Sequence, residues 1–268
     1  MSTTAIAFPS TSSSVTRVLR IFVTEIRFEI VRALRNRTFS VATIGFPIMF
    51  YCLFGLMLNR GVTVNGAPLA KILLGSYAVF GGFGTALFGI GVAMAADLSA
   101  GWLELKRASP MPPIAYLLAK CCSAMCFSVI IATILCLIGI TAGHVSLSFQ
   151  EYLRMAALSV AGAIPFASMG LALALTVPFN SAPGVAQLLY LPMSFLGGLW
   201  VPLAILPKAV QNIAQVLPTY HMGQLMLGVF GYADPRHTLM QHWAGLFGYT
   251  CLMLGIAWIA FRRREQAS

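Results

Sequence analysis

The residues of this 268-residue chain that could act as acids, bases or metal ligands are few and scattered. The seven acidic residues are Glu25, Glu29, Asp97, Glu104, Glu151, Asp234 and Glu265. No two of them have the spacing of the paired carboxylates that hold a catalytic metal ion. All lie at or beyond the ends of the apolar segments described below, whereas an ion-coupled carrier usually needs a carboxylate near the middle of the membrane.

Nucleophiles and soft metal ligands are equally uninformative. No serine lies in a Gly-x-Ser-x-Gly turn. We assign the four histidines to exterior loops, where a solvated or capping role is the default. They are His144, His221, His237 and His242. The six cysteines fall within apolar segments, where they are expected to be small packing residues and not a disulfide framework. They are Cys52, Cys121, Cys122, Cys126, Cys136 and Cys251. The sequence therefore predicts no catalytic residue and no metal site.

A nucleotide-binding loop is also not predicted. No lysine lies in a Gly-x-x-x-x-Gly-Lys-[Ser/Thr] pattern, whose backbone amides would cradle phosphates. The lysines are Lys71, Lys106, Lys120 and Lys208. If the chain takes part in transport, the energy must come from another protein.

Composition predicts an integral membrane protein. The chain is 59% hydrophobic and 9% charged, with a mean hydropathy of +0.85. About 20 apolar residues cross a hydrocarbon core of about 30 Å. Six such spans are predicted, at about 38–58, 72–96, 114–141, 152–177, 184–202 and 240–261. The fold class expected is all-α, with one six-span domain over residues 38–261 and no separate soluble domain.

An amphipathic basic helix is predicted before the first span. Met1–Ser14 is rich in Ser and Thr and is expected to be a disordered tail. From residue 15 to 35 apolar residues recur at helical spacing. The opposite face carries Arg17, Arg20, Arg27, Arg32 and Arg35. A helix of this kind, over residues 15–37, is expected to lie in the headgroup plane with its arginines facing lipid phosphates. An ordinary soluble amphipathic helix is the alternative.

The basic residues predict the orientation. Twelve of the 17 lysines and arginines lie before residue 39, between spans two and three with the start of span three, or at Arg262–Arg264. The positive-inside rule then places both termini, including the tail 262–268, in the cytoplasm. The protein is accordingly expected in the inner or plasma membrane of the cell. The net charge of +10 is thus a topology signal, and no nucleic-acid partner is predicted.

The loop after span two could bind a partner protein. Leu98, Trp102 and Leu105 share one helical face, and Glu104 and Arg107 are neighbours on another. Pro110, Pro112 and Pro113 end the helix rigidly before span three. A short, partly apolar helix held outside the membrane suits a pocket on another protein. A helix that merely turns the chain around is an equally good interpretation of the residues alone.

Two motifs resemble those of ABC-2 type exporter permeases. Gly101-Trp-Leu-Glu-Leu-Lys-Arg-Ala-Ser-Pro110, followed by Leu117-Leu-Ala-Lys120, is similar to their G-T-L-E-x-L-x-x-S-P segment and the L-x-x-K after it. The stretch 200–220 resembles their P-x-x-x-L-P signature and the L-P-x-x-Y that follows it, here ending Leu217-Pro-Thr-Tyr220. Trp102 departs from the family, in which a small threonine is commoner. With the basic helix and six spans, the resemblance covers nearly the whole chain.

The resemblance implies a division of labour. Two permease subunits, here a homodimer, would act in the lipid bilayer with two cytoplasmic P-loop ABC ATPases. ATP and magnesium would be used by that partner, with no cofactor bound by this chain. A coupling helix over residues 98–108 would dock on the ATPase. The coupling residues would be Leu98, Trp102, Glu104, Leu105, Arg107 and Pro110. Glu104 would hold this helix by pairing with an arginine, one of those on the 15–35 helix.

An extracellular cap is predicted between spans five and six. Residues 208–217 form an amphipathic segment that is too short to span and is bracketed by prolines. Its marker residues are Pro202, Pro207, Leu217, Pro218 and Tyr220. A re-entrant helix dipping into the outer leaflet is expected, as the resemblance also implies. A plain surface helix is the alternative.

The cargo pathway is expected to be apolar. Aromatic and methionine side chains among glycines can line an adaptable hydrophobic route, although lipid-facing and packing roles explain most of them. The candidates are Phe80, Phe83, Tyr190, Met193 and Phe195. A hydrophobic or amphiphilic cargo such as a drug, an antibiotic or a lipid is expected, moved out of the cytoplasm or inner leaflet. Alternatives are export of a lipid-linked glycan or envelope precursor, a membrane-bound enzyme, and a regulatory membrane subunit.

Overall fold

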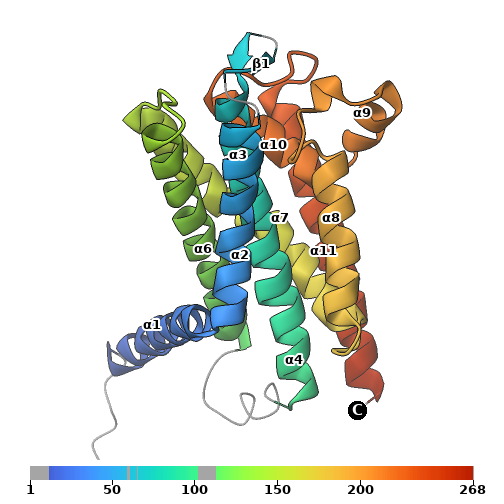
Figure 1. The fold of residues 1–268 in the computed structure, drawn as a ribbon. Helices are drawn as coiled ribbons and strands as arrows, with labels where there is room; N and C mark the ends of the chain where they lie inside the picture. Colours follow the sequence, from blue (N-terminus) through green and yellow to red (C-terminus); the bar gives the residue numbers. More distant parts are fainter. Residues whose placement is uncertain (1–11, 59–60, 65, 102–112, 268) are drawn as a thin grey trace, which may run out of the picture.

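The structure is a computed structural model that describes residues 12–58, 61–64, 66–101 and 113–267. Helices make up most of this part of the chain (Figure 1). In order they are α1 (Ser12–Arg35), α2 (Arg37–Phe50), the π-helix η1 (Tyr51–Met57), α3 (Leu69–Ala86), the π-helix η2 (Leu87–Val92), α4 (Ala93–Ser99), α6 (Pro113–Thr141), α7 (Phe149–Thr176), α8 (Ala182–Leu196), the 3-10 helix η3 (Leu203–Ile205), α9 (Lys208–Ala214), α10 (Pro218–Val229) and α11 (Leu239–Ala267). A two-stranded antiparallel hairpin joins η1 to α3, formed by β1 (Thr63–Val64) and β2 (Ala67–Pro68).

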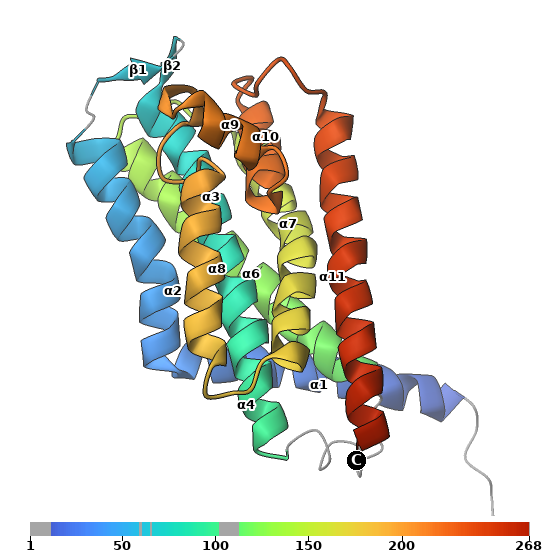
Figure 2. The same cartoon turned by 90° about the vertical axis from the view of Figure 1, so that its right-hand side faces the viewer.

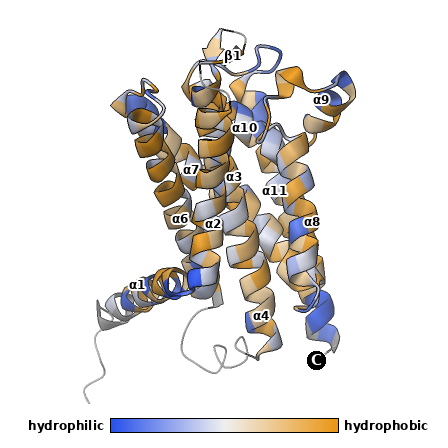
Figure 3. Cartoon of the chain, viewed as in Figure 1, coloured by the Kyte–Doolittle hydropathy of each residue, from blue (hydrophilic) through white to orange (hydrophobic). Residues whose placement is uncertain are grey.

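The long helices form a bundle with two distinct ends. At one end lie α1, the end of α4 and the C-terminal end of α11; at the other lie the hairpin, α9 and α10 (Figures 1 and 2). We call these the α1 end and the α9 end. Apolar residues dominate the bundle between them, and the C-terminal end of α11 is strongly hydrophilic (Figure 3). This pattern of apolar helices is that of a multi-pass membrane protein.

Five helical stretches are long and apolar enough to cross a membrane. They are Arg37–Met57, Leu69–Ser99, Ile114–Thr141, Phe149–Thr176 and Leu239–Arg264. They match five of the six predicted spans. The other predicted span corresponds to α8, which has only 15 residues and is about 22 Å long, shorter than a hydrocarbon core of about 30 Å. That α8 crosses the membrane, and therefore that the chain has six spans, stays a prediction.

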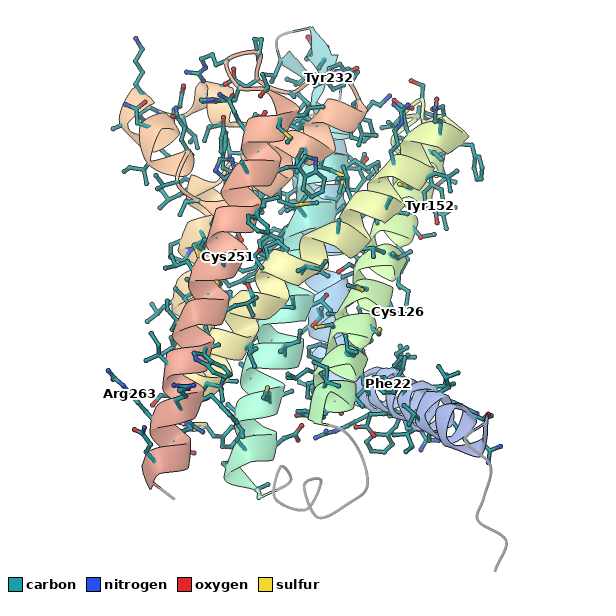
Figure 4. All side chains as sticks on the ribbon, turned by 180° about the vertical axis from the view of Figure 1, so that it is seen from behind. Phe22, Cys126, Tyr152, Tyr232, Cys251 and Arg263 are labelled. Carbon is teal, nitrogen blue, oxygen red and sulfur yellow. The ribbon has the colours of Figure 1, made fainter. Side chains whose placement is uncertain are left out.

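The predicted amphipathic helix is present as α1, which turns sharply into α2. Asn36 breaks the helix, and its side-chain oxygen accepts a hydrogen bond from the backbone N–H of Phe39 at 3.2 Å. The hydroxyl of Ser40 donates to the carbonyl of Ala33 at 2.7 Å, which fixes the corner. As a result α1 lies across the base of the bundle and packs on α6, with Phe22 beside the lower end of α6 (Figure 4). Apolar side chains such as Leu19 and Val23 stay exposed on α1, and their contact with lipid remains a prediction.

α3 and α7 form the centre of the bundle, whereas α2 and α11 are mostly exposed. The closest approach in the centre involves glycines. A Cβ added to Gly170 of α7 would lie 2.9 Å from the carbonyl oxygen of Ala86 and 3.0 Å from the amide nitrogen of Gly91. Only a residue without a side chain lets two backbones approach this closely. Gly91 is the other glycine of this crossing, since a Cβ added to it would lie 3.2 Å from the carbonyl oxygen of Gly170.

The α9 end differs from its prediction in one respect. The predicted cap segment 208–217 contains the helix α9, with η3 before it and α10 after it, and most of α10 is buried. No separate helix was predicted over α10, which lies in the link between the fifth and sixth predicted spans. Pro207 caps α9, and Pro218 is the first residue of α10, where the missing proline N–H costs no hydrogen bond. Entry of the cap into the outer leaflet stays a prediction.

Candidate functional site

Five polar side chains from three helices meet at the α1 end of the bundle. They are Glu29 and Arg32 of α1, Asp97 of α4, and Tyr116 and Lys120 of α6. We call this group the α1–α4–α6 ion network. It lies at the base of the helix that leads into the predicted coupling segment, because Asp97 is two residues from the end of α4.

Asp97 is the centre of the network. The guanidinium of Arg32 donates two hydrogen bonds to its carboxylate, Nη2 to Oδ1 at 2.7 Å and Nη1 to Oδ2 at 3.2 Å. The hydroxyl of Tyr116 donates to Oδ2 at 2.6 Å. A two-pronged arginine contact fixes direction as well as distance. The end of α4 is therefore held to α1 and α6 at once.

Lys120 links the carboxylate of Glu29 to the carboxylate of Asp97. Its ammonium lies 3.2 Å from Oε2 of Glu29 and 3.2 Å from Oδ2 of Asp97. The side chains of Lys120, Glu29 and Asp97 are 3%, 6% and 7% exposed, so water screens little of this charge. Two cations and two anions balance each other. Burying charges without such pairing is expensive, which makes each member depend on the others.

Arg32 is the member of the network nearest to water. Its side chain is 43% exposed. The hydrogen bond to Asp97, together with the charges of Asp97 and Glu29, raises the pKa of Arg32 above the ordinary arginine value against the opposing effect of burial. The contact between α1 and α4 thus stays charged at every physiological pH.

Local helix geometry explains why these residues meet. Glu29 and Arg32 are three apart on α1, and Tyr116 and Lys120 are four apart on α6, so each pair lies on one face of its helix. The spacing is visible in the sequence, but no contact of Glu29 or Asp97 was predicted, and Lys120 was identified only through the L-x-x-K motif and the distribution of charge. The packing of α1 against α6 brings the two faces together.

A pocket of about 110 Å³ opens beside the network. It is lined on one side by Glu29, Arg32 and Lys120, and on another by apolar and small residues of α1, α2, α3, η2 and α6, including Phe39 and Gly89. The pocket leaves room for side chains to move where these helices join.

The predicted coupling residues are only partly within the described structure. Leu98 is in α4 and packs in the bundle core. Trp102, Glu104, Leu105, Arg107 and Pro110 lie outside the described residues, and so does the predicted pairing of Glu104. The expectation of one helix over 98–108 is wrong at its start. Leu98 continues the span-two helix, which ends at Ser99, and Gly101 follows with a φ of +70°, a left-handed conformation that ends helices.

The arginines of α1 separate into two groups. Arg20, Arg27 and Arg35 are exposed, as expected for a face turned toward headgroups or water. Arg32, although its side chain is 43% exposed, also binds Asp97 and Glu29, which was not predicted; its contact with lipid phosphates stays a prediction. The side chain of Arg17 lies outside the described part. The protein thus uses one arginine of this face for a tertiary contact.

At the α9 end, the histidines are not the solvated loop residues that were predicted. His221 of α10 and His242 of α11 approach each other with their Nδ1 atoms 3.0 Å apart. His242 is fully buried, and the ring of His237 lies 5.9 Å from its ring. His144 is in a loop and is exposed, and His237 lies in the loop between α10 and α11. The prediction was wrong for His221 and His242 because α10, which carries His221 against α11, was not recognised.

A second ion pair at this end joins two spans. Lys71 at the start of α3 donates to Oε1 of Glu151 at the start of α7 at 2.7 Å. Glu151 also accepts from the backbone N–H of Ser148 and completes a capping box with its hydroxyl. Lys71 was counted as a loop charge in the sequence, but it is buried inside the bundle.

Three of the candidate pathway residues come together. Phe80 and Tyr190 stack with ring centroids 4.6 Å apart, and Phe83 lies 5.2 Å from Tyr190. The hydroxyl of Tyr190 donates to the carbonyl of Phe80 at 3.1 Å. All three are buried within one subunit. Met193 is only partly buried, and Phe195 is 41% exposed, so these two lie nearer the surface of α8.

The residues predicted to mark the extracellular cap lie at different positions at the α9 end. Pro202 lines a cavity of about 540 Å³ at the α9 end, together with residues of α3, α10 and the loop after α10. Leu217 precedes α10, and Tyr220 is buried within it. The hydroxyl of Thr219 donates to the carbonyl of Met193 at 2.7 Å, which ties α10 to α8. These residues therefore hold the outer helices together.

Nothing in this geometry resembles a catalytic centre. Across the residues that the structure describes, no group of three or more His, Cys, Asp or Glu side chains is arranged to hold a metal ion. The cysteines in this part are free, and Cys126 of α6 and Cys251 of α11 lie on separate helices (Figure 4). The arrangement can instead transmit a displacement of the segment after α4 to α1 and α6 through fixed ionic contacts.

Comparison with known proteins identifies a matching family and a relative. Residues 21–230 match the sequence model of the family described as ABC-2 type transporter. A relative from Bacillus subtilis (strain 168), named "Putative transport permease YvfS", is 31% identical over 195 residues. The match covers 73% of this chain and 79% of that protein.

Proposed function

Because this chain belongs to the ABC-2 type transporter family, we propose that it is the membrane subunit of an ATP-driven exporter of hydrophobic or amphiphilic cargo. A separate cytoplasmic ABC ATPase hydrolyses ATP with magnesium, and two copies of this chain form the pathway. The chain is a transport permease and not an enzyme. The direction of transport and the class of cargo are part of the proposal.

The observation that carries the proposal is the α1–α4–α6 ion network. A permease driven by another protein needs a rigid connection from the docking surface into the membrane. Asp97 lies at the end of the helix that leads to the predicted docking segment, and it is bound to α1 by Arg32 and to α6 by Tyr116. Force applied after α4 therefore acts on the interfacial helix and on the third span together.

The distribution of charge supports docking at the α1 end. The exposed arginines of α1 and the cluster Arg262–Arg264 lie at this end, which also carries the end of α4 (Figure 2). A basic end is retained on the cytoplasmic side of a membrane. The ATPase, which needs cytoplasmic ATP, then meets the segment after α4.

Packing of the aromatic residues supports a route between two subunits. Phe80, Phe83 and Tyr190 fill the interior of one subunit in ring-to-ring contact, which leaves them no room for cargo. Apolar side chains on the outer faces of α2 and α8 are exposed instead, such as Phe46 and Leu188. Cargo therefore passes along exposed apolar surfaces, with the aromatic cluster as the rigid support behind them.

Reconstitution tests the proposal. The chain is co-expressed with a candidate ABC ATPase from the same organism and purified, and both are placed in proteoliposomes. Lipophilic fluorescent dyes and a phospholipid labelled with nitrobenzoxadiazole serve as probes. We expect the pair to co-purify and at least one probe to be moved only with ATP. ATP hydrolysis by this chain alone, or a stable pair that moves neither class of probe while moving a lipid-linked glycan, would overturn the proposal as stated.

A further inference from the structure

The histidine pair between α10 and α11 has no role in the proposed transport mechanism. His221 and His242 face each other through their Nδ1 atoms at 3.0 Å. The ring of His242 is fully buried, and its Nε2 atom has no hydrogen-bond partner. The ring centroids of the pair are 5.3 Å apart. A contact this short between two ring nitrogens, one of them in a fully buried ring, requires a definite protonation state.

In that state one proton lies between the two Nδ1 atoms and is shared by them. A neutral imidazole has one N–H and one lone pair, so one Nδ1 can donate to the other. If both rings are protonated, two N–H groups and two positive charges face each other at 3.0 Å. No hydrogen bond is then possible, and the repulsion is weakly screened because the pair is buried. A second proton must therefore separate the rings.

We propose that the His221–His242 pair is a proton-binding contact that holds α10 against α11 at neutral pH and releases it when the α9 end is acidified. The ligand is the proton alone. A metal ion is a poorer occupant, since the described residues contain no third ligand arranged to complete a site.

The groups around the pair favour this behaviour. His237, from the loop between α10 and α11, lies against His242, and its own protonation adds a third positive charge. Asp234 of the same loop could compensate that charge, but Arg236 engages both of its carboxylate oxygens at 2.6–3.1 Å. Tyr220 of α10 contacts His242 through its ring and contributes no charge. Among the described residues around the pair, the one carboxylate is therefore already paired with Arg236, which limits how far it can stabilise a second proton.

The sign of the pH effect follows from the geometry. Burial, with a further contribution from His237, lowers the pKa of His221 below its ordinary value. The unfolded or separated state then binds protons more readily than the closed state. The contact is complete above about pH 6.5, the ordinary histidine pKa, and is lost as the pH falls below it.

Release of α10 would change the outer cavity. Gly223, Gln224 and Leu227 of α10 form part of the wall of the cavity of about 540 Å³. The other side of α10 packs on α3, where Phe230 and Met226 meet Gly75. A shift of α10 away from α11 therefore alters the cavity and its contact with span two. This inference does not depend on which cargo is moved or on whether an ATPase is bound.

Hydrogen–deuterium exchange of the full chain in detergent micelles tests the inference. Exchange over residues 218–229 is measured at pH 7.5 and pH 5.0 with EDTA present, corrected for the intrinsic pH dependence of amide exchange. In the native protein we expect protection of α10 to fall by about tenfold or more at pH 5.0, the effect of one linked proton over one pH unit. Protection of α6 serves as the internal reference and should not change.

Variants separate this contact from general acid sensitivity. In His221→Asn the amide can donate or accept, so it follows the protonation of His242 without repulsion. Its α10 protection should be high and equal at both pH values. His242→Asn should behave in the same way, and if one variant fails to fold at pH 7.5 the other carries the test. His144→Asn, on a loop at φ +49° that asparagine tolerates, should retain the native acid response. Equal protection of the native α10 at both pH values, or an acid response that persists in the asparagine variants, would overturn the inference.

Discussion

Lys120 of α6 and Glu29 of α1 form an ion pair 3.2 Å long in which the side chains are 3% and 6% exposed. These residues are 91 positions apart in the chain. The pair binds α1 to α6 at the point where the third element, α4, leaves the bundle. An interfacial helix held only by apolar contact with lipid could slide, whereas a buried ion pair fixes its position along the span.

Removing the ammonium should therefore destabilise the protein. Lys120→Met leaves Glu29 buried with only the longer 3.5 Å contact to Arg32, and we expect a loss of roughly 3 kcal/mol in the free energy of unfolding. Glu29→Gln/Lys120→Met, which restores charge balance, should lose clearly less. Unfolding in mixed micelles with increasing SDS measures both. A single variant as stable as the native protein would show that the pair contributes nothing.

Arg32 should matter more for coupling than for folding. Arg32→Gln removes the two-pronged contact between α1 and α4, while Asp97 keeps Tyr116 and Lys120. We expect normal expression and assembly, with cargo-stimulated ATPase activity of the reconstituted pair reduced several-fold, because transmission depends on a few fixed contacts. Arg35→Gln, an exposed arginine of the same helix, is the matched control and should change neither quantity. An equal response of the two variants would rule out a special role for Arg32.

Glu104 tests the predicted docking segment directly. Glu104→Ala should leave the protein inserted and assembled, because an ion pair at an exposed position contributes about 0–1 kcal/mol. Transport should fall much more than expression. Glu265→Ala, near the C-terminus, serves as the control. If transport and its coupling to ATP survive in both variants, Glu104 is only a solvated charge.

The backbone contact between α7 and span two should tolerate no side chain. In Gly170→Ala the new methyl group would lie 2.9 Å from the carbonyl oxygen of Ala86. We expect the midpoint of thermal unfolding to fall, since overpacking costs about 1–3 kcal/mol. At Gly248 of α11 an added Cβ meets no atom within 4 Å, so Gly248→Ala should be neutral or stabilising through helix propensity. Equal midpoints for the two variants would contradict the close crossing.

The orientation is testable by labelling. In a background without the native cysteines, a cysteine at Asn65 should react with an impermeant thiol reagent in intact cells. Cysteines at Ser109 or Gln266 should react only after lysis, because the positive-inside rule puts the α1 end in the cytoplasm. Labelling of position 266 from outside would require an odd number of crossings.

Much of the fold was predictable because hydrophobic length is a local property. A run of about 20 apolar residues has to cross or be buried wherever it lies, so the stretches at 38–58, 72–96 and 114–141 could be marked from the sequence. The arginine face of the 15–35 helix was equally visible through its periodicity. The stretch of α8 was also marked, as the span 184–202, although its 15 helical residues leave the crossing itself a prediction. The buried α10 was not predicted, since 12 residues are compatible with a cap or a surface helix.

The candidate sites were decided by tertiary structure. No local feature of the sequence distinguishes Arg32 from the other arginines of α1 as the partner of Asp97. None indicates that His221 contacts His242 on another helix. Such pairs depend on how helices cross, and crossing is set by small residues such as Gly91 and Gly170 that allow backbones to touch. The sequence by itself determined that this chain is built of apolar helices long enough to cross a membrane, because apolar length is a local property. Two motifs also carry a resemblance to ABC-2 type permeases, which the family match bears out. Only the packed structure decided which charged and titratable groups lie together, because their partners are brought within hydrogen-bond distance by contacts between residues far apart in the chain.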